Sequence, residues 1–551
     1  MSRHARRILV GTVIGAALVG VGAWAAVSLL GAGSGPRVPR FVDEAAAAGV
    51  DHRYDGEFEF FVGGGVAVLD CDDDGRPDLY FAGGERPAAL YRNASTLGGS
   101  LAFESIPDPA TDLDAVTGAY PLDVDADGHT DLVVLRNAVG NVLLRGLGDC
   151  RFEAANEAFG LDGGEAWTTA FSATWEADAA LPTMAFGNYL VPDPSRQRIE
   201  CDTSLFVRPE GDRYGEPFVL EPGRCALSML FSDWAGAGRR DLRVSNDRHY
   251  DPDAAEQLWL VEPGEEPRLY TEAEGWNTLQ LFGMGIASRD LTGDGLPEVY
   301  LTSQGDNKLQ ALVDPDGGEP RYEDVALERG ATAHRPYEGD TTMASTAWHP
   351  EFADVNNDGL VDLFVSKGNV ESMADFAARD PSNLLIAQAD GSFLEGAPEA
   401  GIVTFARSRG AALADLNLDG LLDLVVVTRR EPVQLWRNVG TGTADTPEPM
   451  GHWLALRLEQ PAPNRDAVGA RVRIEAGEQV TYIELTVGGG HASGQSGWLH
   501  VGLGEAESAE VTVTWPDGEV GAAVRVAANG FAIIERGAES PRAWSPDEVD
   551  E

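Results

Sequence analysis

The sequence is almost without lysine, since Lys308 and Lys367 are the only two in 551 residues. Lysine and arginine together number 41 against 89 aspartates and glutamates, which gives a formal net charge of −48. A surface this acidic repels phosphate backbones and anionic lipid headgroups. The composition therefore argues against nucleic acid and anionic membrane surfaces as partners.

The sequence also lacks the local motifs of the common enzyme classes. Its nine histidines form no H-E-x-x-H or similar metal-binding pair, and it has no G-x-S-x-G turn and no phosphate-binding loop in a βαβ context. His491, Ser493 and Ser496 follow the glycine run 488–490, but the sequence places no acid beside them. A glycine turn explains this segment better, so no catalytic residue is predicted. Active sites assembled from scattered loops leave no such motif, and an enzyme stays an open alternative.

Cysteine is scarce as well, with four residues in the chain. Cys201 and Cys225 bracket a polar insertion rich in proline, glycine and arginine. In an oxidising compartment we expect these two to form a disulfide, the alternative being two unpaired thiols. Cys71 and Cys150 stay unassigned, because sequence alone does not fix disulfide connectivity.

The most informative feature present is an acidic loop that occurs five times, beginning at Asp70, Asp123, Asp290, Asp354 and Asp415. Each copy has oxygen-bearing side chains at positions 1, 3, 5 and 9 and glycine at position 6, and an apolar strand-like run follows it. Calcium takes about six to eight oxygen ligands, and alternate residues of a tight turn can aim oxygens inward. Glycine permits the sharp bend. We therefore predict a structural Ca²⁺ in each of the five copies.

The predicted ligands are the side chains at positions 1, 3, 5 and 9 and the main-chain carbonyl at position 7. In chain order they are Asp70, Asp72, Asp74, Arg76 and Asp78; Asp123, Asp125, Asp127, His129 and Asp131; Asp290, Thr292, Asp294, Leu296 and Glu298; Asp354, Asn356, Asp358, Leu360 and Asp362; and Asp415, Asn417, Asp419, Leu421 and Asp423.

Two alternatives fit part of this pattern. An EF-hand loop also begins D-x-D-x-D-G, but it needs glutamate at position 12 and a helix on each side. Position 12 is apolar in every copy, being Phe81, Val134, Leu301, Val365 and Val426. A metal-free Asp/Gly turn would leave clustered carboxylates repelling one another. Repetition of the loop with an acidic ninth position favours calcium.

The spacing of the loops indicates a repeated β unit. Two degenerate units fill gaps in the series: one keeps Asp233, Gly238 and Asp241, and the segment 174–188 has no usable ligand. A second phrase recurs after the loops, and its first copy, 41–50, has no loop before it. The chain therefore begins in mid-unit, and its first strand can complete the last unit. This offset between the start of the chain and the start of a repeat unit predicts an all-β fold with a seven-bladed β-propeller over residues 36–440.

At the N-terminus, Arg3, Arg6 and Arg7 precede an uncharged stretch, residues 8–32. The stretch is long enough to span a bilayer, and Ala23-Trp24-Ala25 is a candidate cleavage site. Residues 1–35 are therefore predicted as a signal anchor with a cytoplasmic N-terminus or, alternatively, as a cleaved signal peptide. Either predicts an exported protein, at the cell surface if anchored and secreted or periplasmic if cleaved, with this helix as its one membrane contact.

After a Thr/Pro/Gly linker at 441–450, alternating β runs predict a small β-sandwich over 451–537, followed by a disordered acidic tail over 538–551. Four phrases here resemble the ASPIC/UnbV domain: NRDAVGARVRI (464–474), GGGHASGQS (488–496), LHVGLG (499–504) and VTWPDG (513–518).

The acidic repeats resemble FG-GAP/VCBS repeats, and the two regions together resemble bacterial members of the cartilage acidic protein family. The resemblance covers about residues 40–520. It implies an exported calcium-binding propeller, related in architecture to the integrin α-subunit head, and no known reaction. The two degenerate units depart from the family pattern and put metal there in doubt.

The sequence therefore predicts an adhesion or recognition module whose Ca²⁺ is structural and whose ligand is an unknown protein or glycan. One alternative is an extracellular enzyme acting on polysaccharide, with its site in the central channel or in the insertion between Cys201 and Cys225. Another is a structural component of an envelope assembly. The ligand, the binding face and the oligomeric state are not predicted.

Overall fold

The computed structural model describes residues 37–177, 179–191, 199–314 and 318–546. The predicted signal segment, residues 1–35, lies outside them. Within the described residues, no helix has the length and apolar composition needed to cross a bilayer. The described residues from Val38 onward form one compact unit, and the elements below all belong to it.

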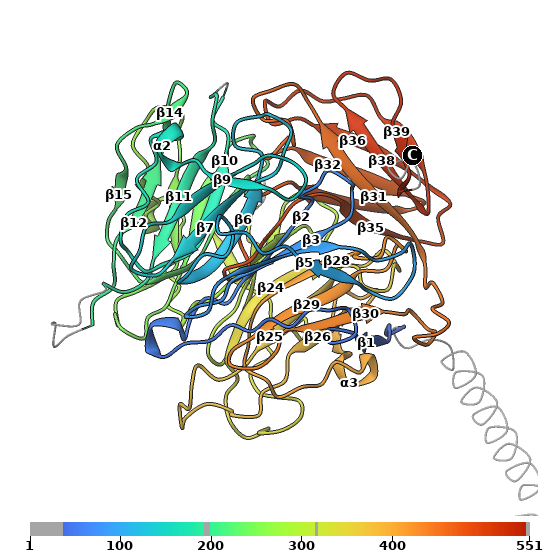
Figure 1. The fold of residues 1–551 in the computed structure, drawn as a ribbon, viewed down its shortest axis with the longest axis horizontal. Coiled ribbons are helices and arrows are strands. Elements are labelled where there is room, and N and C mark those ends of the chain that lie inside the picture. Colours follow the sequence, from blue (N-terminus) through green and yellow to red (C-terminus); the bar gives the residue numbers. More distant parts are fainter. Residues whose placement is uncertain (1–36, 178, 192–198, 315–317, 547–551) are drawn as a thin grey trace, which may run out of the picture. The chain divides into compact units, whose positions relative to one another are not determined.

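Seven sheets, each with four antiparallel strands, account for the described part of residues 41–438 (Figure 1). In chain order they are β2 (Val66–Leu69), β3 (Asp78–Phe81), β4 (Ala89–Asn93) and β5 (Phe103–Ser105); β6 (Val116–Leu122), β7 (Asp131–Arg136), β8 (Val142–Gly146) and β9 (Phe152–Ala154); β10 (Thr168–Thr174), β11 (Thr183–Asn188), β12 (Ser204–Val207) and β15 (Phe218–Leu220); β16 (Ala226–Ser232), β17 (Asp241–Asn246), β18 (Gln257–Leu260) and β19 (Arg268–Leu269); β20 (Ile286–Arg289), β21 (Glu298–Leu301), β22 (Lys308–Leu312) and β23 (Tyr322–Asp324); β24 (Ala347–Ala353), β25 (Asp362–Lys367), β26 (Asn383–Ala387) and β27 (Phe393–Glu395); and β28 (Ser408–Ala414), β29 (Asp423–Thr428) and β30 (Gln434–Asn438) with β1 (Phe41–Asp43).

Short elements occupy some of the connections. A two-stranded hairpin, β13 (Pro209–Glu210) and β14 (Arg213–Tyr214), lies between β12 and β15. The helices of the described residues are each a single turn: η1 (Phe58–Phe60), α2 (Asn156–Phe159), η2 (Glu272–Glu274) and α3 (Ala397–Ala400).

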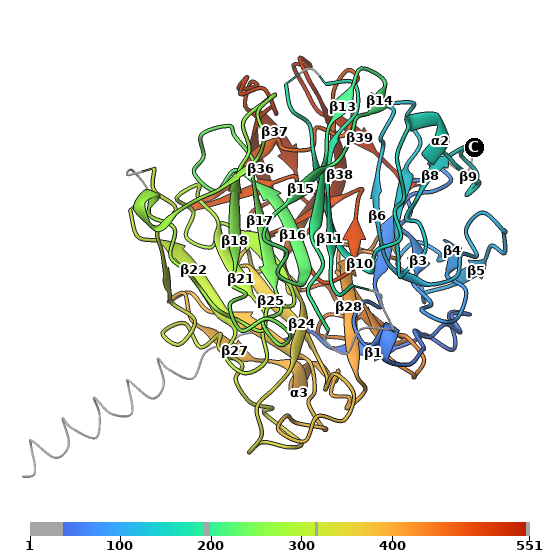
Figure 2. The ribbon, with the colours of Figure 1, turned by 90° about the vertical axis from the view of Figure 1, so that its left-hand side faces the viewer.

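The first strands of the seven sheets contact one another in cyclic order. β2 contacts β6, the contacts continue through β10, β16, β20 and β24 to β28, and β28 contacts β2 again. Figure 2 shows three strands of one of these sheets, β16, β17 and β18, side by side. The last sheet is completed from the other end of the chain, because β1 pairs with β30 and places Phe41 opposite Asn438. We refer to these seven sheets as the ring.

The loop between the first and second strands has the same length in all seven sheets of the ring. Leu69 pairs with Asp78, so residues 70–77 form the first loop, and the same spacing recurs at 122/131, 174/183, 232/241, 289/298, 353/362 and 414/423. The five acidic loops and the two degenerate ones therefore occupy equivalent places at one end of the ring. The third loop begins at Trp175, one residue later than the sequence suggests.

The C-terminal region forms two four-stranded sheets with a common core. One sheet contains β31 (His452–Glu459), β35 (Leu499–Gly504), β38 (Gly530–Glu535) and β39 (Arg542–Trp544), and the other contains β32 (Arg471–Ala476), β33 (Gln479–Glu484), β36 (Ser508–Thr514) and β37 (Val524–Ala527). Leu454 and Leu456 from the first sheet pack with Val472 and Val511 from the second. This is the arrangement of a β-sandwich, and we refer to it as the C-terminal domain.

The structure differs from the sequence prediction in the acidic tail, which was expected to be disordered from residue 538. Residues Arg542–Trp544 form β39 and pair with β38. The reason is aromatic packing: Trp544 lies against Phe531 and Trp498, with ring centroids 5.2 Å and 4.9 Å apart. The acidic composition around Trp544 hides this contact from a reading of composition alone.

Candidate metal centres

The first and sixth positions fix the shape of each acidic loop. In the first loop the Gly75 N–H donates to Asp70 Oδ2 over 2.9 Å, and the same bond occurs in the other four at 2.7–3.1 Å. Gly75 has a φ of 78°, in the left-handed region that favours glycine. The glycine is therefore required both for the bend and for holding the first carboxylate in place.

The ninth position ties the loop to its sheet. Asp78 has no exposed surface; one of its oxygens accepts from the Cys71 N–H at 2.8 Å and the other from the Asn93 N–H on β4 at 2.7 Å. Asp131, Asp362 and Asp423 repeat both bonds. The sequence assigned this residue as a ligand, and the structure adds that it anchors the start and end of the loop to the third strand.

Several predicted ligand oxygens have no protein partner among the described residues. Asp70 Oδ1, Asp72 Oδ1, Asp123 Oδ1 and Asn417 Oδ1 are buried without a hydrogen bond. Asp70, Asp72 and Asp78 each place an oxygen within 4.8 Å of the others, as do Asp123, Asp125 and Asp127 in the second loop. Buried oxygens that converge without donors fit a hard cation, because such groups otherwise lose the free energy of hydration.

The electrostatics of the loops agree with this geometry. Burial, reinforced by neighbouring carboxylates, raises the pKa of Asp131 to about 8 and that of Asp354 to about 8. Burial, with Asp466 as the next cause, raises the pKa of Asp123 to about 7. The loops thus concentrate more negative charge than they can keep ionised alone. A divalent cation bound by oxygens would remove that cost.

In each of the two degenerate loops, a carboxylate pairs with an arginine of the chain. In the loop at 233–240, Arg239 donates to both oxygens of Asp241, at 3.0 and 3.2 Å, and Trp234 Nε1 donates to Asp241 Oδ2 at 2.8 Å. In the third loop Glu176 pairs with Arg208 at 2.8 Å. Where carboxylates are missing, a guanidinium group from the chain balances the remaining charge.

An arginine also approaches two of the complete loops. Arg145 lies 2.5 Å from Asp125 and 3.5 Å from Asp127, and Arg457 lies 3.4 Å from Asp70. These contacts offset part of the charge of the second and first loops. The last three loops have an uncharged residue at position 3, namely Thr292, Asn356 and Asn417.

The four cysteines form two disulfides, Cys71–Cys150 and Cys201–Cys225. The first joins Cys71, at position 2 of the first acidic loop, to Cys150, which lies two residues before β9. The second closes the insertion that carries the hairpin β13–β14. Sequence reasoning left the first pairing open.

The segment 487–496, which contains the glycine run, lies at the centre of the ring, and we call it the central loop. Val487 pairs with Ala173 of β10, Gly488 with Leu230 of β16, Gly490 with Ile286 of β20 and Ser493 with Ala119 of β6. Gly494–Gln495 forms β34, a fifth strand parallel to β2. The two remaining first strands also meet it: the His491 N–H donates to His349 of β24, and Ser493 Oγ faces Gly410 of β28.

His491 and Ser493 have structural partners there. His491 has no exposed surface, its Nε2 accepts from the Gly63 N–H at 3.1 Å, and its Nδ1 lies 3.1 Å from the Met284 carbonyl, to which it donates. Burial lowers the pKa of His491 to about 3, so its imidazole is neutral. Ser493 Oγ accepts from the Val66 N–H at 3.1 Å. These bonds give both side chains a structural role in holding the central loop within the ring.

The C-terminal domain stands on the end of the ring that carries the acidic loops. Trp498 Nε1 donates to the Gly75 carbonyl at 3.0 Å, Arg471 donates to that of Gly295, and Gln479 donates to that of Gly359. Arg465 and Trp453 lie against the corresponding glycines of the second and fifth acidic loops, Gly128 and Gly420. The domain therefore contacts position 6 of all five. Sequence reasoning missed this contact, which no local pattern encodes.

Comparison with known proteins finds family models that match part of the C-terminal domain and part of the ring. Residues 460–541 match the family model described as ASPIC and UnbV, and residues 70–134 match that of an FG-GAP-like repeat. The resemblance predicted from the sequence is confirmed. Cartilage acidic protein 1 from Mus musculus is 25% identical over 244 residues, 43% of this chain and 34% of that protein. The Homo sapiens protein is 25% identical over 244 residues, 43% and 33% of the two chains. The chain thus spans about a third of the length of these relatives.

Two solved structures that match this chain share little of its sequence. The BP39L lectin from Burkholderia pseudomallei matches with a TM-score of 0.43 and 10% identity, over 70% of this chain and 98% of that chain. BBS1N, from its complex with ARL6DN, matches with a TM-score of 0.42 and 10% identity, over 75% and 100%.

We predict that Gly65→Ala dislodges the central loop. A Cβ at this position would lie 1.7 Å from the Ala492 carbonyl oxygen, a main-chain atom that cannot turn away. We expect a loss of roughly 1–3 kcal/mol in unfolding free energy and faster proteolysis near residues 441–450. Gly530→Ala is the control, because nothing lies within 4 Å of its Cβ. Equal stability and equal cleavage of the two variants would contradict the packed central loop.

The guanidinium group of Arg239 should be needed for the stability of its sheet. Arg239→Met leaves Asp241, which has no exposed surface, without its cation, and we expect a loss of about 1–3 kcal/mol in urea unfolding. Added calcium should not restore it, because positions 3 and 5 are Ala235 and Ala237. The control Arg92→Met removes an exposed pair with Glu104 and should cost at most about 0.5 kcal/mol. Restoration by calcium would show that this loop is itself a metal site.

Proposed function

We propose that this chain is an exported β-propeller of seven blades, that its five acidic loops each hold a structural Ca²⁺, and that it serves as a recognition or adhesion module for a protein or glycan. The observation that carries the calcium assignment is the contrast between loops in equivalent places. Five keep oxygen-bearing side chains at positions 1, 3, 5 and 9, which converge in the first two, some of them buried without donors. The other two have lost carboxylates, and an arginine pairs with a remaining one in each.

The residues that would hold the ion are the predicted ligands at positions 1, 3, 5 and 9 and the carbonyl at position 7. When bound, Ca²⁺ supplies the positive charge that the clustered carboxylates lack. The N–H bonds from positions 6 and 7 already orient the carboxylates at positions 1 and 5; in the sixth sheet, Gly359 donates to Asp354 and Leu360 to Asp358. The protein therefore contributes the shape of the site before any ion enters.

The filled centre of the ring favours a binding module over an enzyme with a site in a central channel. The central loop occupies the axis, and its polar groups bond to the first strands around it. Recognition then falls to the outer loops and to the insertion closed by Cys201 and Cys225. Loops on a rigid β scaffold are a common place for binding residues.

An exported location follows from the N-terminal stretch and from the disulfides. Disulfides persist in oxidising compartments, and calcium outside the cytoplasm is abundant enough to fill weak sites without regulation. The N-terminal segment either anchors the protein in the membrane or is cleaved; both place the ring outside.

Metal content tests the calcium assignment directly. We expect mass spectrometry of the purified full-length protein to find about five Ca²⁺ per chain, and EGTA to lower the melting temperature, because an ion at 100 times its Kd adds about 2.7 kcal/mol per site. Asp358→Ala, which removes a ligand of the fourth acidic loop, should reduce the calcium content and the melting temperature. Asp445→Ala, in the exposed linker, is the matched control. No calcium and an unchanged melt would leave the loops as metal-free turns.

The recognition role is tested with arrays of purified glycans and cell-surface proteins, probed with the full-length protein in calcium and in EGTA. We expect retention of a defined subset in calcium and its loss in EGTA, because the ions hold the blades that position the outer loops. Release of products from an arrayed polysaccharide would favour the enzyme instead. Equal retention with and without calcium would show that recognition does not depend on calcium in the acidic loops.

A further inference from the structure

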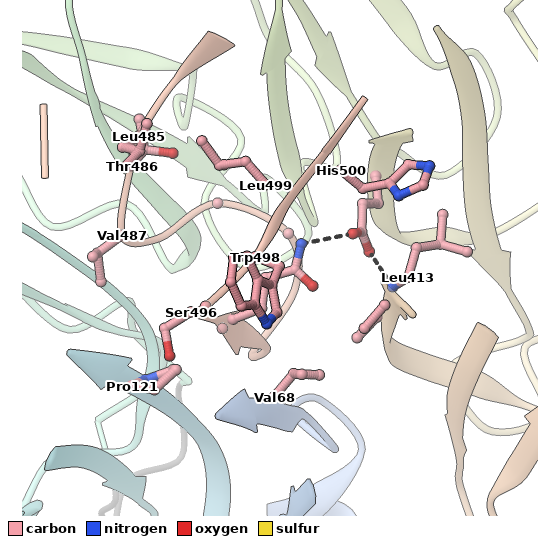
Figure 3. A pocket seen from close by; sticks show the side chains of 18 of the residues that line it. Val68, Pro121, Leu413, Leu485, Thr486, Val487, Ser496, Trp498, Leu499 and His500 are labelled. Carbon is pink, nitrogen blue, oxygen red and sulfur yellow. Dashed lines mark hydrogen bonds between the residues drawn. The ribbon is translucent and has the colours of Figure 1, made fainter. Parts of the chain in front are cut away.

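A cavity of about 390 Å³ lies between the first strands of the ring and the C-terminal domain. Figure 3 shows apolar side chains from several elements along its wall, including Val68, Pro121, Leu413, Leu485, Val487 and Leu499. Polar and charged groups, Arg289 among them, share the wall with these apolar side chains, and a cavity of this size is typical of a site for a small organic molecule.

Arg289 is the unusual polar residue of this cavity. It is the last residue of β20, it lines the cavity, and it is partly buried. None of its guanidinium nitrogens makes a hydrogen bond or ion pair with a described residue, and its Nε is fully buried without a partner. Asp290 and Asp354 act on it electrostatically from beyond ion-pair distance. In a chain with a net charge of −48 an unpaired, partly buried arginine is unexpected.

Three carboxylates along the cavity, those of Glu351, Glu484 and Asp415, are already held by other groups. Glu351 accepts from the Leu413 N–H at 3.1 Å and from Gln495 Nε2 at 2.9 Å, the two bonds drawn in Figure 3. Glu484 accepts from the Asp233 N–H through both oxygens. Asp415 accepts from the Asp419 and Gly420 N–H groups.

The two carboxylates that face Arg289 are also committed. Asp290 accepts from Gly293 and Gly295, and Asp354 accepts from Asp358 and Gly359.

The other charged and basic groups nearby do not compete with Arg289 for an anion. Arg457 is paired with Asp70 at 3.4 Å and lies over the Trp498 ring at 4.7 Å. His500 bonds to Asn357 Oδ1 through Nε2 at 2.7 Å, and burial together with Arg289 lowers its pKa to about 3, so it is neutral. Arg289 is left as a lining cation without a hydrogen-bonded or ion-paired partner among the described residues.

We propose that this cavity binds a small organic carboxylate, with the carboxylate on the guanidinium group of Arg289 and an apolar body against Val68, Leu413 and Leu499. A planar guanidinium group matches a carboxylate in two parallel hydrogen bonds. Binding would supply the anion that the chain does not, and burial of the apolar body would supply affinity.

The test is isothermal titration of the full-length protein with hexanoate, with hexanamide as the uncharged analogue and with sulfate as an anion without an apolar body. We expect hexanoate to bind with one site per chain and hexanamide and sulfate to bind at least about tenfold more weakly. Arg289→Met, which keeps the stem and removes the charge, should weaken hexanoate about 10- to 100-fold. Arg92→Met is the control and should bind as the unmodified protein does.

A second variant keeps the test decisive if Arg289→Met does not fold. Leu499→Trp enlarges a lining side chain of the cavity and should weaken hexanoate while Arg289 stays in place. Absence of hexanoate binding at millimolar concentration, or equal binding by the unmodified protein and a folded Arg289→Met variant, would overturn the proposal. Sulfate binding as tightly as hexanoate would overturn the assignment of an apolar body.

Discussion

The structure depends on how buried carboxylates at the loop end of the ring are balanced. Each complete loop brings three or four acidic or amide side chains into a turn whose ninth residue has little or no exposed surface. Main-chain N–H groups hold one or both oxygens of many of these carboxylates, yet they cannot cancel the net charge. The loops with fewer carboxylates take an arginine. Positive charge at this place would stabilise the start of the sheet, the anchor to the third strand and the surface beneath the C-terminal domain.

Glycine at position 6 serves two requirements at once. It gives the left-handed turn that lets its own N–H reach the first carboxylate, and it leaves the outer side of the loop free of a side chain. Trp544 lies against Gly75, Arg465 against Gly128 and Trp453 against Gly420. A calcium loop that only had to bind an ion would tolerate a solvent-facing end. Here the same glycine is also a packing surface for the C-terminal domain.

Much of the fold and the loops could be predicted from the sequence, because both come from short repeated patterns. The acidic loops, the apolar runs after them and the mid-unit start at Phe41 are local signals, and the β1–β30 pairing agrees with that start. The central loop could not be assigned its place, since His491 bonds to Gly63, 428 residues earlier. Its glycines look like an ordinary turn until the ring is present. The place of Trp544 could not be predicted for the same reason, because the pairing of its strand with β38 brings its aromatic partners near it.

The central loop also constrains how the two regions come together. The strands before and after it, β33 and β35, both belong to the C-terminal domain. The central loop therefore enters and leaves the ring at the end that carries the acidic loops, and the chain does not thread through the ring. Pairing with β2 requires strands near residue 67 to be in place when a segment near residue 494 arrives. The C-terminal domain therefore supplies the segment that fills the centre of the ring. Since strands alternate in direction, the connections between second and third strands lie at the opposite end, and that end and the outer rim are the surfaces left for a large partner.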